Sequence, residues 1–204
     1  FETYRNRFLF FMLREFIDFV DSVLPSVSPD FRDGAKDAIS QFEKDGHQIN
    51  YLTSTLLPEL SQGDIISKVP FTYFEEDGRQ MIFTADAMVI STSCHIDQKD
   101  KILMVPVFPI DSFTGNLVEL KKNMVFDFMY IPDNVMSKRY VCFNMMTSYN
   151  KKLICGGIEN GKIKRIASLN QIGYYFFIIK LSVYLMRKED PDTLGFRKCL
   201  SKAI

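Results

Sequence analysis

An α+β fold is predicted for this chain of 204 residues on three observations. Hydrophobic residues make up 47% of the chain and aromatic residues 14%, which is enough to bury one sizeable core. Apolar residues recur at helical spacing through the first sixty residues, whereas short apolar runs separated by turn residues follow from residue 62. A long apolar run then returns near the C-terminal end. We therefore expect a helical extension over residues 1–60, a β domain over 61–188 and a tail over 189–204.

Two helices are expected in the extension. Residues 2–23 carry apolar side chains on one side at helical spacing, and Pro25 ends this helix because the residue before a proline avoids the helical region. Ser28 and Pro29 suit the cap and the first position of a second helix, which Gly46 can stop. These helices could dock a protein partner, as amphipathic helices do, or cover an open side of the β domain.

The β domain is predicted from short β-branched and aromatic runs. Asp77-Gly78 lies between two such runs and is a strong hairpin signal. Several short strands at close spacing are typical of a small barrel or a strongly bent sheet. The expected strands are residues 64–67, 70–75, 80–84, 87–91, 101–108, 124–130 and 139–144, with further strand material around 153–166.

A long buried helix is expected over residues 168–188. Ser168 and Gln171 have the spacing of a capping box, and the residues that follow are apolar nearly all round. Lys180 interrupts this run, which is shorter than the roughly 18–20 residues that cross a bilayer, so no membrane partner is expected. The tail is read as a loop with a short final turn.

Charge and cysteine usage narrow the function classes. Residues 1–111 carry 10 Lys and Arg against 18 Asp and Glu, net −8, whereas residues 112–204 carry 15 against 7, net +8. This asymmetry allows a basic face for nucleic acid, and equally a chain that pairs its own halves. The cysteines, at 94, 142, 155 and 199, form no CxxC pair. We expect reduced thiols, a cytoplasmic protein, no metal and no cofactor.

The stretch MVISTSCHIDQKDKILMVPV places a cysteine and a histidine between two apolar runs. His95 is a candidate for acid–base work, because histidine is the side chain most often used for it near neutral pH, and Ser91 and Cys94 are further candidates for catalytic residues. The competing interpretation is structural: Ser91, Ser93 and Asp97 satisfy the backbone of a turn between two strands, with Cys94 directed into the core. A cysteine-dependent enzyme built on Cys94 is a separate alternative.

Basic pairs recur in the second half of the chain with aromatic residues between them. Cationic groups and stacking rings would suit single-stranded RNA, whereas solvated strand faces and protection of sheet edges are the commoner explanation. The candidate nucleic-acid-binding residues are Lys121, Lys122, Lys138, Arg139, Lys151 and Lys152.

Three segments within residues 63–109 resemble a known family. QGDI opens a strand, a hairpin follows, and AMVIS and KILMVPV form the next two strands. This order resembles the core of the MazF/PemK-type toxins, in which a GD[IV] strand, a hairpin and an ALVIS-like strand pair build an SH3-like barrel. The resemblance implies that barrel, and it implies metal-independent cleavage of single-stranded RNA, which many members perform.

This chain departs from the family pattern at two positions. The family has an arginine just before its ALVIS-like strand, where this chain has Ala85-Asp86-Ala87, and Arg79 in the hairpin is the nearest substitute along the sequence. A hydroxyl residue commonly follows the family's second strand, but here Ser112 and Thr114 come only after Ile110. Metal-free RNA cleavage needs a base, an acid and a cation for the developing phosphorane charge.

Two functions of different classes are therefore expected. The first is a module directed at single-stranded RNA in a toxin–antitoxin or phage-defence system, with endoribonuclease activity as the enzymatic form. The second is a catalytically inert SH3-like interaction module that binds a protein partner or a small ligand. An antitoxin bound through the N-terminal helices and a homodimer are the corresponding protein partners.

Overall fold

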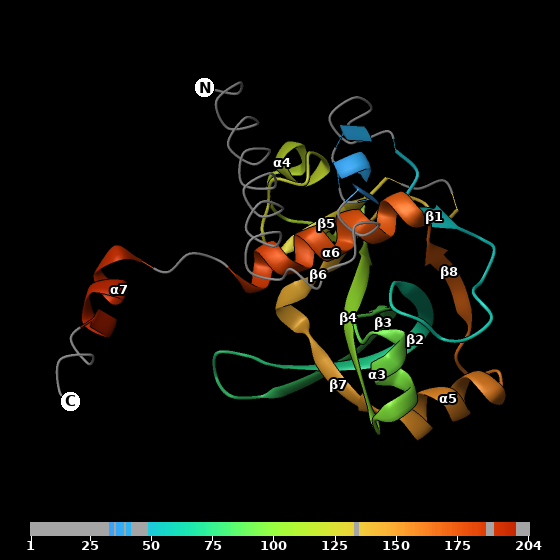
Figure 1. Ribbon diagram of the computed structural model, residues 1–204. Coiled ribbons are helices and arrows are strands. Elements are labelled where there is room, and N and C mark those ends of the chain that lie inside the picture. Colours follow the sequence, from blue (N-terminus) through green and yellow to red (C-terminus); the bar gives the residue numbers. More distant parts are fainter. Residues whose placement is uncertain are drawn as a thin grey trace.

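The computed structural model describes residues 33–34, 36–38, 40–41, 49–132, 135–186 and 190–198. The helix expected over residues 2–23 lies outside these ranges. The described residues between 33 and 41 are helical and fall within the expected second helix. Figure 1 shows the whole chain with its elements labelled.

An antiparallel sheet forms the body of the protein (Figure 1). Its centre consists of β2 (Asp64–Phe74), β3 (Gln80–Val89) and β4 (Lys101–Pro109), which follow one another in the chain and pair as neighbours. The strand order is β1-β8-β2-β3-β4-β6-β5, and β7 also pairs with β4. The other strands are β1 (Leu52–Thr53), β5 (Phe128–Ile131), β6 (Arg139–Cys142), β7 (Thr147–Asn150) and β8 (Arg165–Leu169).

The sheet is not closed into a barrel, which corrects the expected architecture. β1 and β5 stand at the two ends of the strand order, and in the described part of the chain they do not pair with each other. β4 pairs with β3 along one edge, while along its other edge its first half pairs with β7 and its last residues pair with β6. The fold is therefore α+β with an open eight-stranded antiparallel sheet.

Helices cover both faces of the sheet (Figure 1). On one face α6 (Gln171–Leu185) packs through Phe176 and Phe177 against residues such as Met88 and Val141. On the opposite face α3 (Ser93–Gln98) and α5 (Lys151–Glu159) contribute Ile96 and Ile154 to a second cluster. Because successive residues of a strand point to opposite faces, the central strands are buried on both sides and contain long apolar runs.

A third apolar cluster lies at the β5–β6 end of the sheet. It is built around α4 (Leu117–Lys121), whose Leu120 packs against Tyr130 and Tyr140. Short 3-10 helices, η2 (Ile110–Ser112) and η3 (Phe143–Met145), follow β4 and β6. Aromatic rings connect this cluster to the second one, since Phe83 stacks on Phe108 and Phe108 contacts Tyr140.

Several predicted elements differ from the observed ones. The expected strands 64–67 and 70–75 are one long strand, β2, with a bulge between Ile66 and Val69, and β3 likewise merges two expected strands. Strand material was expected around residues 153–166, but the part up to residue 159 belongs to α5. The tail, expected to be a loop, contains helix α7 (Pro191–Lys198). The hairpin at Asp77-Gly78 is confirmed, and Gly78 has the positive φ (82°) that its turn requires.

The buried helix α6 is confirmed, although it begins one turn later than expected. Asn170, rather than Ser168, caps it by accepting a hydrogen bond from the N–H of Gly173. Lys180 is nearly completely buried within it and donates hydrogen bonds to the carbonyl oxygens of Asn123 and Val125, at 2.9 and 2.8 Å. Among the helices that are described, α6 included, none combines the length and the apolar character needed to span a membrane.

Candidate functional site

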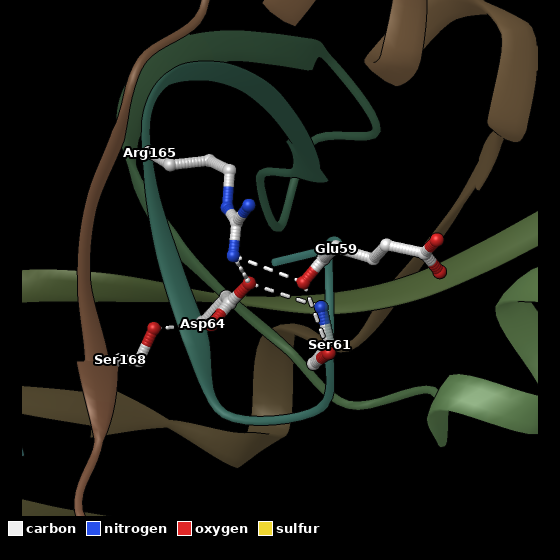
Figure 2. A network of polar contacts seen from close by, with 5 residues as sticks. All are labelled: Glu59, Ser61, Asp64, Arg165 and Ser168. Carbon is white, nitrogen blue, oxygen red and sulfur yellow. Dashed lines mark hydrogen bonds and ion pairs between the residues drawn. The ribbon is translucent and has the colours of Figure 1, made fainter. Parts of the chain in front are cut away.

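The QGD motif that opens β2 anchors the sheet. Asp64 is completely buried, and its carboxylate accepts hydrogen bonds from the hydroxyl of Ser168 (2.6 Å), the N–H of Ser61 (2.9 Å) and Nη2 of Arg165 (2.7 Å), as Figure 2 shows. The same Arg165 nitrogen also donates to the carbonyl oxygen of Glu59. This network ties the turn before β2 to β8, so Asp64 has a structural role.

Gly63, the glycine of the QGD motif, is required by the backbone geometry. Its φ is +85°, a backbone conformation that residues other than glycine rarely adopt. A Cβ at this position would also lie 2.7 Å from a methyl group of Leu169. The motif is therefore explained by backbone geometry and a buried carboxylate, without a ligand.

The Cys-His stretch forms α3 and not a turn, which corrects one expectation. The Thr92 hydroxyl accepts from the N–H of His95 and caps the helix, and the Ser91 hydroxyl accepts from the N–H of Leu103 at 2.9 Å. Cys94 was expected to face the core, but it is exposed, and Ile96 is the buried residue of this helix. Ser91 thus has a structural contact, while Cys94 and His95 face outward.

Arg79 does not join these residues. It lies at the tip of the β2–β3 hairpin, which projects from the sheet away from α3 (Figure 1). Its guanidinium pairs with Asp77 two residues earlier, and both side chains are largely exposed. The four candidate catalytic residues named from the sequence are therefore distributed over two separate places.

A pocket of about 480 Å³ lies beside α3 and the first turn of α6. Cys94 lines it, whereas His95 does not. None of the described residues that line it is charged. Its lining is Leu57, Ser61, Gln62, Thr92, Ser93, Cys94, Leu169, Asn170, Gln171, Tyr174 and Tyr175. Several of these polar groups are already bonded within the protein, such as the Gln62 amide, which donates to the Ile90 carbonyl oxygen at 2.6 Å.

The basic pairs are not gathered on one surface either. Lys121 is the last residue of α4 and Lys122 its C-cap, while Lys151 and Lys152 begin α5, and these two helices lie at opposite ends of the sheet (Figure 1). The Lys151 ammonium donates to the carbonyl oxygen of Asp97, which attaches α5 to α3. Of the six candidate residues, Arg139 alone lines one of the two pockets described here.

Arg139 lines a cleft of about 290 Å³ where β3 and β4 separate. We call this the Arg139 cleft. β3 and β4 pair as far as Asp86 and Val107, and β4 then continues beside β6 alone. The cleft is lined by Lys68, Thr84, Ala85, Asp86, Val107, Phe108, Pro109 and Arg139.

An ion pair crosses the Arg139 cleft. Nη1 of Arg139 lies 2.9 Å from a carboxylate oxygen of Asp86, and Nε donates to the carbonyl oxygen of Met136 at 3.1 Å. The two charged side chains are 24% and 19% exposed, so solvent and a ligand can reach the pair. The guanidinium is held in place from two sides, which orients its remaining N–H groups.

Lys68 reaches the cleft because of the bulge in β2. Its φ is +58°, an uncommon value for a residue with a side chain, and it lies between Ile66 and Val69, where the strand register shifts. Bulges of this kind redirect a side chain, and they are over-represented next to active sites. Lys68 and Thr84 make no hydrogen bond to any other described residue through their side chains, so the ammonium and the hydroxyl are available to a ligand.

The sequence identified only one member of this cleft. Arg139 was named as a nucleic-acid contact, whereas Lys68, Thr84 and Asp86 were not named as site residues. A signal was present at Asp86, because a charged residue inside an apolar strand requires a partner. The bulge that places Lys68 could not be seen from its local sequence.

No metal site is evident in the described ranges, since no group of three or more His, Cys, Asp or Glu side chains is placed to share an ion. A scan against protein-family models gave no match, and a search of curated proteins found no sequence similar to this chain.

Proposed function

We propose that this chain is a module directed at single-stranded RNA, of the kind found in toxin–antitoxin or phage-defence systems, and that the Arg139 cleft binds the RNA backbone. The observation that carries the proposal is the combination of two cationic groups and a free hydroxyl around one cleft. Arg139 offers planar, directed N–H groups to a phosphate, and Lys68 offers a mobile charge.

The position of the cleft, within the segment that resembles the MazF/PemK-type toxins, supports the proposal. Asp86, in the cleft, occupies the segment where that family has its arginine, and Pro109 ends the strand after which the family commonly has a hydroxyl residue. In this chain Arg139 brings a guanidinium to that place from β6, and Thr84 brings a hydroxyl from β3. The chemical groups that the sequence lacks at those positions are thus supplied by neighbouring strands.

Binding is the activity that we propose for the cleft. Cleavage would need a base, an acid and a cation around one phosphate. Asp86 could accept a proton and Arg139 could hold the phosphate, but the described lining contains no histidine that would protonate the leaving oxygen near neutral pH. Endoribonuclease activity remains a prediction from the resemblance, to be measured alongside binding.

The test is binding of a fluorescent mixed-sequence single-stranded RNA across a salt series. We expect Arg139→Gln to weaken binding roughly tenfold and to reduce the slope of log affinity against log salt by about 0.7, the value for one lost phosphate contact. Lys68→Gln should act in the same direction. Lys152→Gln is the matched control, because this exposed lysine lies on α5 at the other end of the sheet.

Cleavage of the same RNA is followed in parallel, with His95→Ala as the comparison. Loss of cleavage in this variant would place the chemistry on α3 and not in the Arg139 cleft. If the parent protein fails to bind RNA at low salt, or if Arg139→Gln and Lys68→Gln bind as the parent does, the proposal is wrong. The inert interaction module would then be the function to pursue.

A further inference from the structure

The outer half of the β2–β3 hairpin is a two-stranded arm. β2 pairs with β8 only from Asp64 to Ile66, and β3 pairs with β4 only from Asp86 to Val89. Ser67 makes one further backbone hydrogen bond, to the carbonyl oxygen of Lys164. Beyond it, among the described residues, the two strands pair only with each other, and Figure 1 shows them projecting from the sheet. On β2 the outward carbonyl oxygen of Pro70 accepts a hydrogen bond from the Tyr149 hydroxyl, whereas the outer edge of β3 presents its backbone groups to solvent.

The hydrogen-bond pattern identifies the free groups on β3. The N–H of Glu75 donates to the carbonyl oxygen of Arg79, so this pair is a hydrogen-bonded one. Hydrogen-bonded and non-bonded pairs alternate along an antiparallel ladder. Counting from Arg79, the residues whose N–H and C=O point away from β2 are Gln80, Ile82 and Thr84.

The two edges of the arm differ in protection. On β2 the edge carries Lys68, a bulge and Pro70, which are features that prevent another strand from pairing. On β3 the segment from residue 80 to residue 85, Gln-Met-Ile-Phe-Thr-Ala, has no charge, no proline and no register shift. This edge is suited to accept a strand.

Exposed apolar side chains accompany the open edge. Ile82 and Phe74 are each 70% exposed. Ile82 lies opposite Thr72 and Phe74 lies opposite Gln80 in the register, so all four side chains are on one face of the arm. Ile82 and Phe74 thus add exposed apolar surface beside the open edge.

We propose that the β3 edge pairs with the same edge of a second copy of this chain, antiparallel and about a two-fold axis at Ile82. The three residues with free groups are symmetric about Ile82, so Gln80 of each copy would face Thr84 of the other, and the two Ile82 residues would face each other. Pairing between the copies is confined to residues 80–84, because from Asp86 onward the same edge of β3 is paired with β4.

Charge complementarity also favours a second copy. The tip of the arm carries three acidic residues, Glu75, Glu76 and Asp77, against one basic residue, Arg79, which pairs with Asp77. Antiparallel pairing places the tip of each copy beside the other copy's Arg139 cleft. Arg139 is already paired with Asp86 there, so Lys68 is the cation that the acidic tip would meet. The uncharged strand introduces no repulsion across the axis. This inference concerns assembly and does not rest on the proposed RNA binding, but the tip of the second copy and an RNA phosphate would compete for the same cleft.

Sedimentation over a concentration series tests the proposal. We expect the parent protein to dimerise and Ile82→Lys to be monomeric, because it places two like charges at the axis. Thr72→Lys is the matched control, since Thr72 shares the exposed face of the arm but lies on β2, away from the axis. It should dimerise as the parent does. A monomeric parent, or a dimer that survives Ile82→Lys, would overturn the proposal.

Cross-linking tests the register. In a Cys94→Ser background, which removes an exposed thiol, Ile82→Cys should form a disulfide-linked dimer under mild oxidation, and Thr72→Cys should not. Equal cross-linking at both positions would show random collision and contradict the two-fold axis. Melting curves of each variant establish that the fold is retained. RNA binding by monomeric Ile82→Lys is measured separately, so that failure of one proposal leaves the other testable.

Discussion

Asp86 on β3 and Arg139 on β6 pair across β4, with 2.9 Å between a carboxylate oxygen and Nη1. The strand between them leaves β3 at this point, which opens the cleft that both residues line. The pair holds the guanidinium in place, and the carboxylate also competes with any anion for it. Replacing Asp86 by asparagine distinguishes the two effects.

Asp86→Asn should strengthen RNA binding. The substitution removes a negative charge next to the proposed phosphate site while keeping the shape of the side chain. Repulsion between this carboxylate and a phosphate in a water-accessible site makes binding less favourable by about 1 kcal/mol, so removing it should raise the affinity roughly fivefold. The measurement is the RNA titration at constant salt. Weaker binding would contradict this prediction. It would mean that Asp86 helps binding by positioning Arg139 more than its negative charge opposes binding.

The Asp64 network should be a main contributor to stability. Asp64→Ala leaves Arg165 without its buried partner, and breaking a buried pair in this way costs about 3 to 5 kcal/mol. Urea unfolding provides the measurement. Ser168→Ala is the comparison, because it removes one hydrogen bond to the same carboxylate and should cost about 1 kcal/mol. Equal losses in the two variants would contradict the central role of the Asp64–Arg165 pair.

The sequence predicted best where local chemistry decides the structure. Asp77-Gly78 produced the expected hairpin because its turn needs a residue with positive φ. The sequence predicts a strand where α5 forms, because a Gly-Gly pair such as Gly156-Gly157 is typical of a strand boundary. In the structure a Cβ at Gly157 would lie 2.6 Å from Ile163, so this glycine allows the helix to pack closely against the segment that follows it. That reason is tertiary and has no local signature.

The Arg139 cleft could not be predicted for a related reason. Its lining comes from four strands, and their relative placement depends on a bulge in β2 and on the divergence of β4 from β3. Each charged residue of the cleft is visible in the sequence. What could not be predicted is that Arg139 reaches Asp86, 53 positions earlier, across an intervening strand.

Lys180 should give the protein a measurable pH dependence. Burial lowers the pKa of its ammonium from 10.5 to about 7, against the opposing effect of Asp127. Between these two values the unfolded chain binds a proton that the folded chain has released, so the contribution of Lys180 to stability increases as the pH rises from 7. Below pH 7 both states are protonated and the full cost of burying the charge is present.

The measurement is the free energy of unfolding of the parent and of Lys180→Met between pH 7 and pH 9. The stability of the variant relative to the parent should fall with pH by up to about 1.4 kcal/mol per unit. Lys180→Arg, which stays charged throughout, should show the same trend relative to the parent. A constant difference over this range would show that Lys180 does not change its protonation on folding.

Two buried tyrosines should respond to the same substitution with opposite signs. Tyr51 stacks on Phe176 in the core, and its hydroxyl is buried without a hydrogen-bond partner among the described residues. Its burial raises the pKa of the phenol, which reflects the same lack of polar surroundings. Tyr51→Phe removes an unsatisfied polar atom and keeps the stacked ring, so stability should increase by roughly 1 kcal/mol.

Tyr149 provides the contrast. Its hydroxyl donates to the carbonyl oxygen of Pro70 at 2.7 Å and so connects β7 to β2, and burial raises its pKa to about 12. Tyr149→Phe should lower stability by about 1 kcal/mol, because the carbonyl loses its donor. Thermal unfolding of both variants measures the two effects under identical conditions. If both substitutions destabilise the protein, the Tyr51 hydroxyl has a partner after all, and the core around Phe176 is more polar than its geometry indicates.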